Sequence, residues 1–143
     1  MKTIWIGAAA ALSLLAAGPA SAATEHFSAT LKGSEETPAN TTTGTGKVDA
    51  VLDTGTRAFA YTVNYSGLTG PATAAHFHKG AAGVAGPPVL PVPKEVVAHN
   101  PMKGHAQLTA DQVKDLEAGL WYFNIHTAAN PGGEIRGQVT KAK

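Results

Sequence analysis

Apolar and polar residues alternate along most of the chain, as they do in strands that bury one face. The clearest run is 57–68, in which Phe59, Tyr61 and Val63 share one face and small or polar residues occupy the other. Similar short runs occur at 24–31, 47–53, 74–79, 105–108, 120–126 and 133–139. Turn residues, such as the Asn-Pro-Gly of 130–132, separate them. The pattern predicts an all-β chain of about seven antiparallel strands, packed as a β-sandwich.

One segment shows helical signals instead. Thr109 followed by Gln112 forms a capping-box pattern, Val113 and Leu116 supply an apolar stripe, and Gly119 is a natural stop. We therefore predict one short helix connecting two strands. A loop rich in glycine and proline over 80–93 follows the strand at 74–79, and we expect its backbone to pass close to that strand.

The first 22 residues have the features of an export signal. Lys2 supplies the positive start, residues 4–17 are apolar, and Ala20-Ser21-Ala22 is a small-residue cleavage site. The remaining residues, 23–143, are enough for one domain. We expect a periplasmic or secreted protein with no membrane insertion after cleavage.

The composition of the chain argues against disulfides, a lipid anchor and a nucleic-acid partner. The chain contains no cysteine, so neither disulfides nor a lipid anchor at the cleavage site is expected. Removal of the signal takes away one lysine and leaves ten basic and ten acidic residues. This balance argues against a nucleic-acid partner, which requires a basic face.

Three histidines carry the most specific chemistry. His76 and His78 are two residues apart on a predicted strand, so both point to the face opposite Phe77. His126 ends the strand predicted at 120–126, again opposite its apolar face. Three imidazoles on neighbouring strands predict a transition-metal site for copper or zinc. The competing interpretation is a hydrogen-bonded polar cluster.

Glu134 and Arg136 are also two residues apart, on the strand predicted at 133–139. Glu134 would be a fourth ligand or orient an imidazole, and Arg136 would attract an anion to an open metal position. The alternative is a salt bridge or a fork of hydrogen bonds that holds the turn at 130–133, and we favour it.

Two further groups of residues have weaker signals. His99, Met102 and His105 lie in a loop whose thioether and imidazoles would suit cuprous copper, although loop histidines are more often simply solvated. Glu35 and Glu36 are adjacent, so on a strand they face opposite ways. We expect one of these carboxylates to pair with a Lys or Arg and the other to be solvated.

Four segments together resemble the CHRD (chordin) domain of exported bacterial proteins: 31–38 (LKGSEETP), 75–80 (AHFHKG), 122–127 (YFNIHT) and 130–139 (NPGGEIRGQV). The resemblance covers almost all of 23–139. It implies an immunoglobulin-like β-sandwich and says little about activity. The strand His-x-His followed by a glycine-rich loop is also similar to copper–zinc superoxide dismutase, but the cysteine pair and the additional metal ligands of that family are missing here.

Three functions follow as hypotheses. The first is non-enzymatic binding of copper or zinc by His76, His78 and His126. The second is an interaction module that binds another exported protein, with structural histidines. The third is a copper enzyme that disproportionates superoxide. Sensitivity to a chelator separates the first from the second, and metal-dependent turnover identifies the third.

Overall fold

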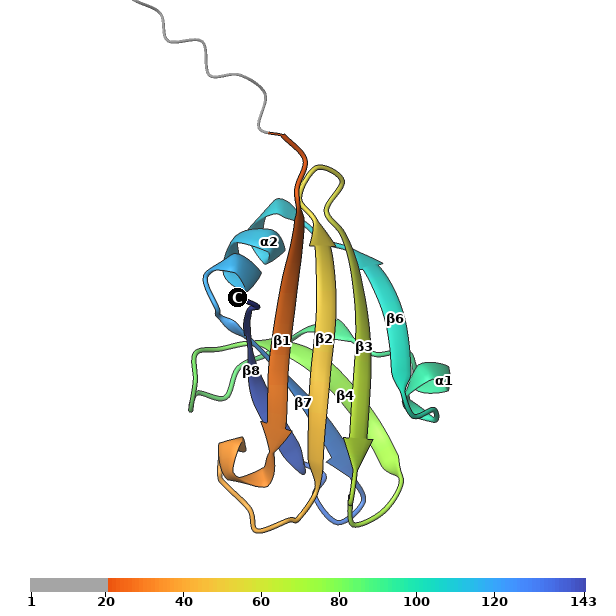
Figure 1. Cartoon of the computed structure of the whole chain (residues 1–143). Coiled ribbons are helices and arrows are strands. Elements are labelled where there is room, and N and C mark those ends of the chain that lie inside the picture. The colour runs from red at the N-terminus through yellow and green to blue at the C-terminus, as the bar shows by residue number, and fades with distance from the viewer. Residues whose placement is uncertain (1–20) are drawn as a thin grey trace, which may run out of the picture.

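The structure is a computed structural model that describes residues 21–143 (Figure 1). The predicted signal, 1–22, therefore lies almost entirely outside the described residues. The elements in chain order are β1 (Thr24–Lys32), the 3-10 helix η1 (Gly33–Glu35), β2 (Thr45–Asp53), β3 (Ala58–Ser66), β4 (Ala72–Lys79), β5 (Pro88–Pro91), α1 (Lys94–Val97), β6 (Met102–Gln107), α2 (Ala110–Glu117), β7 (Trp121–Thr127) and β8 (Ile135–Lys141). None of the helices in 21–143 has the length and apolar character needed to cross a membrane.

The all-β antiparallel class predicted from the sequence is confirmed. The eight strands form one sheet in the order β5-β4-β7-β8-β1-β2-β3-β6, curled into a half-barrel (Figure 1). The sandwich and its immunoglobulin-like details are not confirmed, because a continuous series of ladders joins all the strands into this one sheet. Both predicted and observed arrangements bury one face of every strand, which is why alternation alone does not distinguish them.

The core lies inside the curl, where strands that are not neighbours in the sheet face one another. Phe59 and Tyr61 of β3 pack edge-on against Phe77 of β4, with ring centroids 5.5 and 5.1 Å apart. Trp121 and Phe123 of β7 complete this aromatic cluster, and both are fully buried. These are the apolar faces that alternation predicted. Because these side chains are buried, the residues that alternate with them on β4 and β7 point away from the core.

The sheet bends where β8 meets β1. The ladder there pairs Lys32 with Arg136 and Ser28 with Thr140 but is interrupted between them. A Cβ on Gly137 would clash with the carbonyl oxygen of Thr30. Only glycine permits this close approach of the two backbones.

The helix α2 confirms its sequence signals. Gln112 N donates to Thr109 Oγ1 (3.1 Å), and Thr109 N donates to Gln112 Oε1 (2.9 Å). The prediction of a single helix was incomplete, because α1 and η1 are also present. The strand β5 was not predicted, because it lies within the segment 80–93 that was interpreted as a loop. This edge strand begins and ends with proline, a composition that speaks against strand structure in a sequence.

Candidate metal centre

Pairing of β4 with β7 brings the three histidines together. His78 lies opposite Tyr122, His76 opposite Asn124, and Ala74 opposite His126. His126 is thus the diagonal neighbour of His76, within reach of a long side chain. Ala74 leaves room beside His126 for the imidazole to lean across.

The three imidazoles meet at a distance that suits one metal ion. His76 Nδ1 and His126 Nε2 are 3.2 Å apart. Two ligands of a tetrahedral zinc ion are separated by about 3.3 Å. Each of His76, His78 and His126 offers a ring nitrogen, and these atoms lie within 4.8 Å of one another. In the described part of the chain this is the only such cluster of at least three His, Cys, Asp or Glu residues.

Backbone carbonyls fix the protonation pattern of two of the rings. His78 Nδ1 lies 2.9 Å from the carbonyl oxygen of Gly86, and His126 Nδ1 lies 2.9 Å from that of Pro131. A carbonyl oxygen only accepts hydrogen bonds, so Nδ1 carries the hydrogen in both neutral rings. Nε2 of each therefore presents a lone pair, as in metal-binding histidines oriented by a carbonyl.

The glycine-rich loop covers His78, as its composition predicted. Gly86 N donates to the Tyr122 hydroxyl (3.0 Å), and this hydroxyl donates to the Gly86 carbonyl oxygen (3.1 Å). The same oxygen accepts from His78, whose ring stacks on Tyr122 with centroids 4.7 Å apart. A Cβ on Gly86 would clash with the carbonyl oxygen of Lys79, so glycine is required there.

Burial favours the neutral form of His76 and His78. It is the main cause that lowers the pKa of His76, to which His126 and His78 add. Burial also lowers the pKa of His78, aided by His126 and Arg136, although the contacts with the Gly86 backbone and Asn124 act in the opposite direction. Neutral imidazoles are the form that binds a metal ion.

Arg136 is buried next to this cluster. Its guanidinium donates to the carbonyl oxygens of Ala81 and Val84 and lies 3.5 Å from the centroid of the Tyr122 ring. Because β7 lies between β4 and β8, Tyr122 separates Arg136 from His78. Arg136 thus holds the loop and Tyr122 in place.

Glu134 is fully buried but does not approach the histidines as a ligand. Its carboxylate accepts hydrogen bonds from Thr42 Oγ1, Thr69 N, Thr69 Oγ1 and Thr127 Oγ1, at 2.6–2.9 Å. Burial alone would raise the pKa of Glu134, but these hydrogen bonds together lower it to about 2. Glu134 therefore makes a fork of hydrogen bonds, but none of them is to the turn at 130–133 that the favoured interpretation named.

Sequence reasoning did not single out two buried polar residues, Asn124 and Glu36, as members of the site. Asn124 is 4% exposed and Glu36 is 8% exposed. Burial raises the pKa of Glu36 to about 7, against the lowering effect of Arg136, the Asn124 side chain and the Thr37 backbone. Glu35 is exposed, as expected of one of the two glutamates, but the buried Glu36 makes no ion pair with a Lys or Arg of residues 21–143, contrary to the expectation for the other. Asn124 alternates with Tyr122 and His126 on one strand face, which was the available clue.

His99, Met102 and His105 are not brought together. Met102 is completely buried in the core, whereas His99 and His105 are exposed. Within β6, residues three apart face opposite sides of the sheet, so Met102 and His105 diverge.

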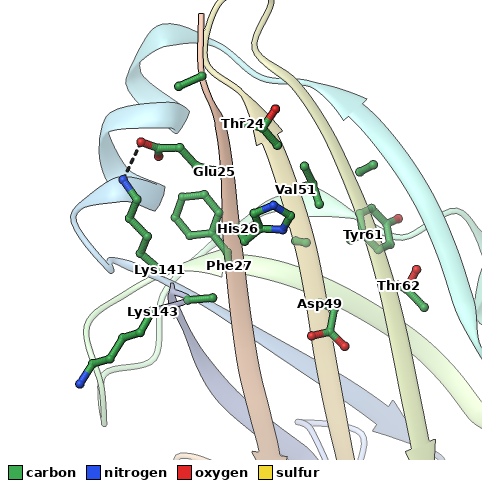
Figure 2. Close-up of a pocket in the computed structure, with 14 residues that line it drawn as sticks. Thr24, Glu25, His26, Phe27, Asp49, Val51, Tyr61, Thr62, Lys141 and Lys143 are labelled. Carbon is green, nitrogen blue, oxygen red and sulfur yellow. Dashed lines mark hydrogen bonds and ion pairs between the residues drawn. The ribbon is translucent and has the colours of Figure 1, made fainter.

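A large hollow lies elsewhere, on the outer face of β1, β2 and β3 (Figure 2). It measures about 770 Å³ and is open to solvent. Its side chains include His26, Asp49, Val51 and Thr62, next to the ion pair of Glu25 with Lys141 (2.5 Å) (Figure 2). Asp49 is paired with Lys47, and His26 does not join any histidine cluster here.

Comparison with known proteins assigns the family. The family model for the CHRD domain matches residues 27–139, nearly all of the described chain. The chain belongs to the CHRD family. No curated protein and no solved structure matches it. The histidine cluster and the residues around it all lie within the matched segment of this CHRD domain.

Proposed function

We propose that this CHRD-domain protein binds one copper or zinc ion through His76, His78 and His126, without catalysing a reaction, after export from the cell. The observation that carries the proposal is the tautomer pattern. Two carbonyl oxygens hold the Nδ1 hydrogens of His78 and His126, so both Nε2 lone pairs remain free to bind a metal ion.

In the metal-free protein, the short contact between His76 Nδ1 and His126 Nε2 is a hydrogen bond. His126 Nε2 is an acceptor, so His76 Nδ1 carries the hydrogen. A metal ion at His76 Nδ1 replaces that hydrogen, and His76 takes its other tautomer. Because the burial-lowered pKa values of His76 and His78 favour neutral rings, metal binding at neutral pH needs little proton release.

The test is elemental analysis of protein purified without an affinity tag, followed by titration with Cu²⁺ and Zn²⁺. We expect one equivalent of bound metal, lost in the His76→Ala/His78→Ala variant. The matched control is His26→Ala/His105→Ala, which removes two exposed histidines and leaves the site intact. Equal metal binding by all three proteins would show that the binding is adventitious, and no binding by any of them would leave the histidines a structural role.

A further inference from the structure

Asn124 occupies the centre of the histidine face. It lies opposite His76 in the β4–β7 ladder and between Tyr122 and His126 on β7. Its side chain is almost completely buried, yet Asn124 Oδ1 has no hydrogen-bond partner. His78 Nε2 is also buried without a partner. Buried polar atoms in proteins are nearly always paired, so two unpaired atoms beside one cluster call for an explanation.

The two unpaired atoms are both acceptors. An amide oxygen cannot donate, and His78 Nε2 carries a lone pair because Nδ1 holds the hydrogen. The Asn124 side chain lies on the same face of the sheet as the three imidazoles, directly opposite His76 in the β4–β7 ladder. Unpaired acceptors that are gathered in a buried site are unfavourable unless a cation binds them.

The orientation of the amide follows from its other neighbour. Glu36 Oε1 and Asn124 Nδ2 both lie so close to Gly133 that a Cβ on this glycine would clash with each of them. The Asn124 side chain stabilises the ionised form of Glu36, as a donating Nδ2 does. With Nδ2 directed at the Glu36 carboxyl, Oδ1 is directed away from it, toward the histidines.

We propose that Asn124 Oδ1 is the fourth ligand of the metal centre, held in orientation by Glu36. This inference rests on the proposed function of the histidine site and completes its donor set as three imidazole nitrogens and one amide oxygen. An oxygen ligand is hard, so such a site favours divalent zinc or cupric ions over cuprous copper. Glu36 acts as a positioning residue, because it contacts the amide and not the ion.

The experiment titrates the protein with Zn²⁺ and Cu²⁺ and compares the variants Asn124→Ala, Asn124→Asp and Asn64→Ala. We expect Asn124→Ala to weaken binding by about 10- to 100-fold, the range seen when a residue supporting a metal site is removed. Asn124→Asp supplies a carboxylate oxygen at the same place, so we expect affinity at least equal to that of the unaltered protein. Asn64 is an exposed asparagine on β3, and its substitution should change nothing.

The aspartate variant separates a ligand from a structural amide. Aspartate cannot donate to Glu36, so a role limited to that hydrogen bond predicts equal losses in Asn124→Asp and Asn124→Ala, which would overturn the inference. The electron paramagnetic resonance spectrum of bound Cu²⁺ gives a second readout. It must change in Asn124→Asp if the oxygen is a ligand, and an unchanged spectrum refutes the inference even if Asn124→Ala does not fold.

Failure of the proposed function gives a different result. If the histidines bind no metal, the unaltered protein takes up neither ion, and both inferences fall together. If the unaltered protein and Asn124→Ala bind Zn²⁺ with the same affinity while His76→Ala/His78→Ala does not bind, the histidine site stands and Asn124 is not its ligand.

Discussion

Glu36 and Glu134 are both buried glutamates, and they differ in how their oxygens are satisfied. Glu134 accepts four hydrogen bonds from Thr42, Thr69 and Thr127, and its pKa falls to about 2. Glu36 has one oxygen without a partner, and its pKa rises to about 7. Burial disfavours the charge in both, so the hydrogen bonds decide the difference.

The contrast extends to the regions around the two carboxyls. Thr42 precedes β2, Thr69 lies between β3 and β4, and Thr127 ends β7, so the hydrogen bonds of Glu134 join three distant segments. Around Glu36, both Asn124 Oδ1 and His78 Nε2 also lack partners. A fully paired polar group stabilises the fold, whereas the group of unpaired acceptors is the one that we propose binds a metal ion.

The largest expected effect is at Glu134. Glu134→Ala leaves the donors of Thr42, Thr69 and Thr127 unsatisfied in a buried site, and we expect it to lower the free energy of unfolding by about 4 kcal/mol. Urea unfolding at pH 7 measures the loss. Glu35→Ala, at an exposed glutamate, is the control and should change stability by less than about 0.5 kcal/mol. A similarly small loss for Glu134→Ala would remove the distinction between the two regions.

The pH dependence of the free energy of unfolding tests the raised pKa of Glu36 and the lowered pKa of Glu134. Because the pKa of Glu36 is raised from 4.5 to about 7 in the folded protein, folding favours its protonated form, and its contribution to stability falls as pH rises from 4.5 to 7. Replacement by glutamine removes this titration. We therefore expect the stability of Glu36→Gln relative to the unaltered protein to improve by about 3 kcal/mol between pH 4.5 and pH 8.

Urea unfolding across this pH range, with a chelator present, measures the relative stability. Glu134 has the reverse sign: its pKa is lowered from 4.5 to about 2, so its contribution is present above pH 4.5 and is lost as pH falls toward 2. A constant difference between Glu36→Gln and the unaltered protein at every pH contradicts the raised pKa of Glu36.

Metal binding at the histidine site should stabilise the folded protein, and this effect should depend on His76 and His78. At a free Zn²⁺ concentration of about 100 times Kd, we expect the free energy of unfolding to rise by about 2.7 kcal/mol. Thermal unfolding with and without Zn²⁺ gives the increase in Tm. The His76→Ala/His78→Ala variant should show no increase, and the His26→Ala/His105→Ala control should match the unaltered protein. An equal increase in all of them would place the metal elsewhere.

Loss of one hydroxyl that donates to Glu134 gives the smallest expected effect. Thr127→Val removes a hydroxyl that donates to Glu134 Oε2 (2.6 Å) and also accepts from Asn130 N (3.2 Å), while keeping the β-branched shape, and we expect a loss of about 1.5 kcal/mol. Thr140→Val, at an exposed position of β8, is the matched control and should be nearly neutral. If both threonine variants unfold at the same urea concentration, the Glu134 network contributes less than its geometry indicates.

Local features of the chain were predicted from the sequence, and features that depend on distant segments were not. The faces of Phe77 and of His76 and His78 were predicted correctly, because alternation along a strand is a local property of the backbone. The helix signalled by Thr109 and Gln112 was also local and was confirmed. The strand β5 was missed because its prolines dominate a short segment whose pairing comes from β4.

The sequence by itself determined the β class, the family and the orientation of each histidine relative to its own strand. Only the tertiary structure decided that β4 pairs with β7 in the register that places His126 diagonally opposite His76. It also decided that Glu36 lies next to Asn124 and Arg136, although these residues are far apart in the chain. The physical reason is that side-chain direction is set by local backbone geometry, whereas register, curl and the pairing of buried polar groups depend on contacts between distant segments.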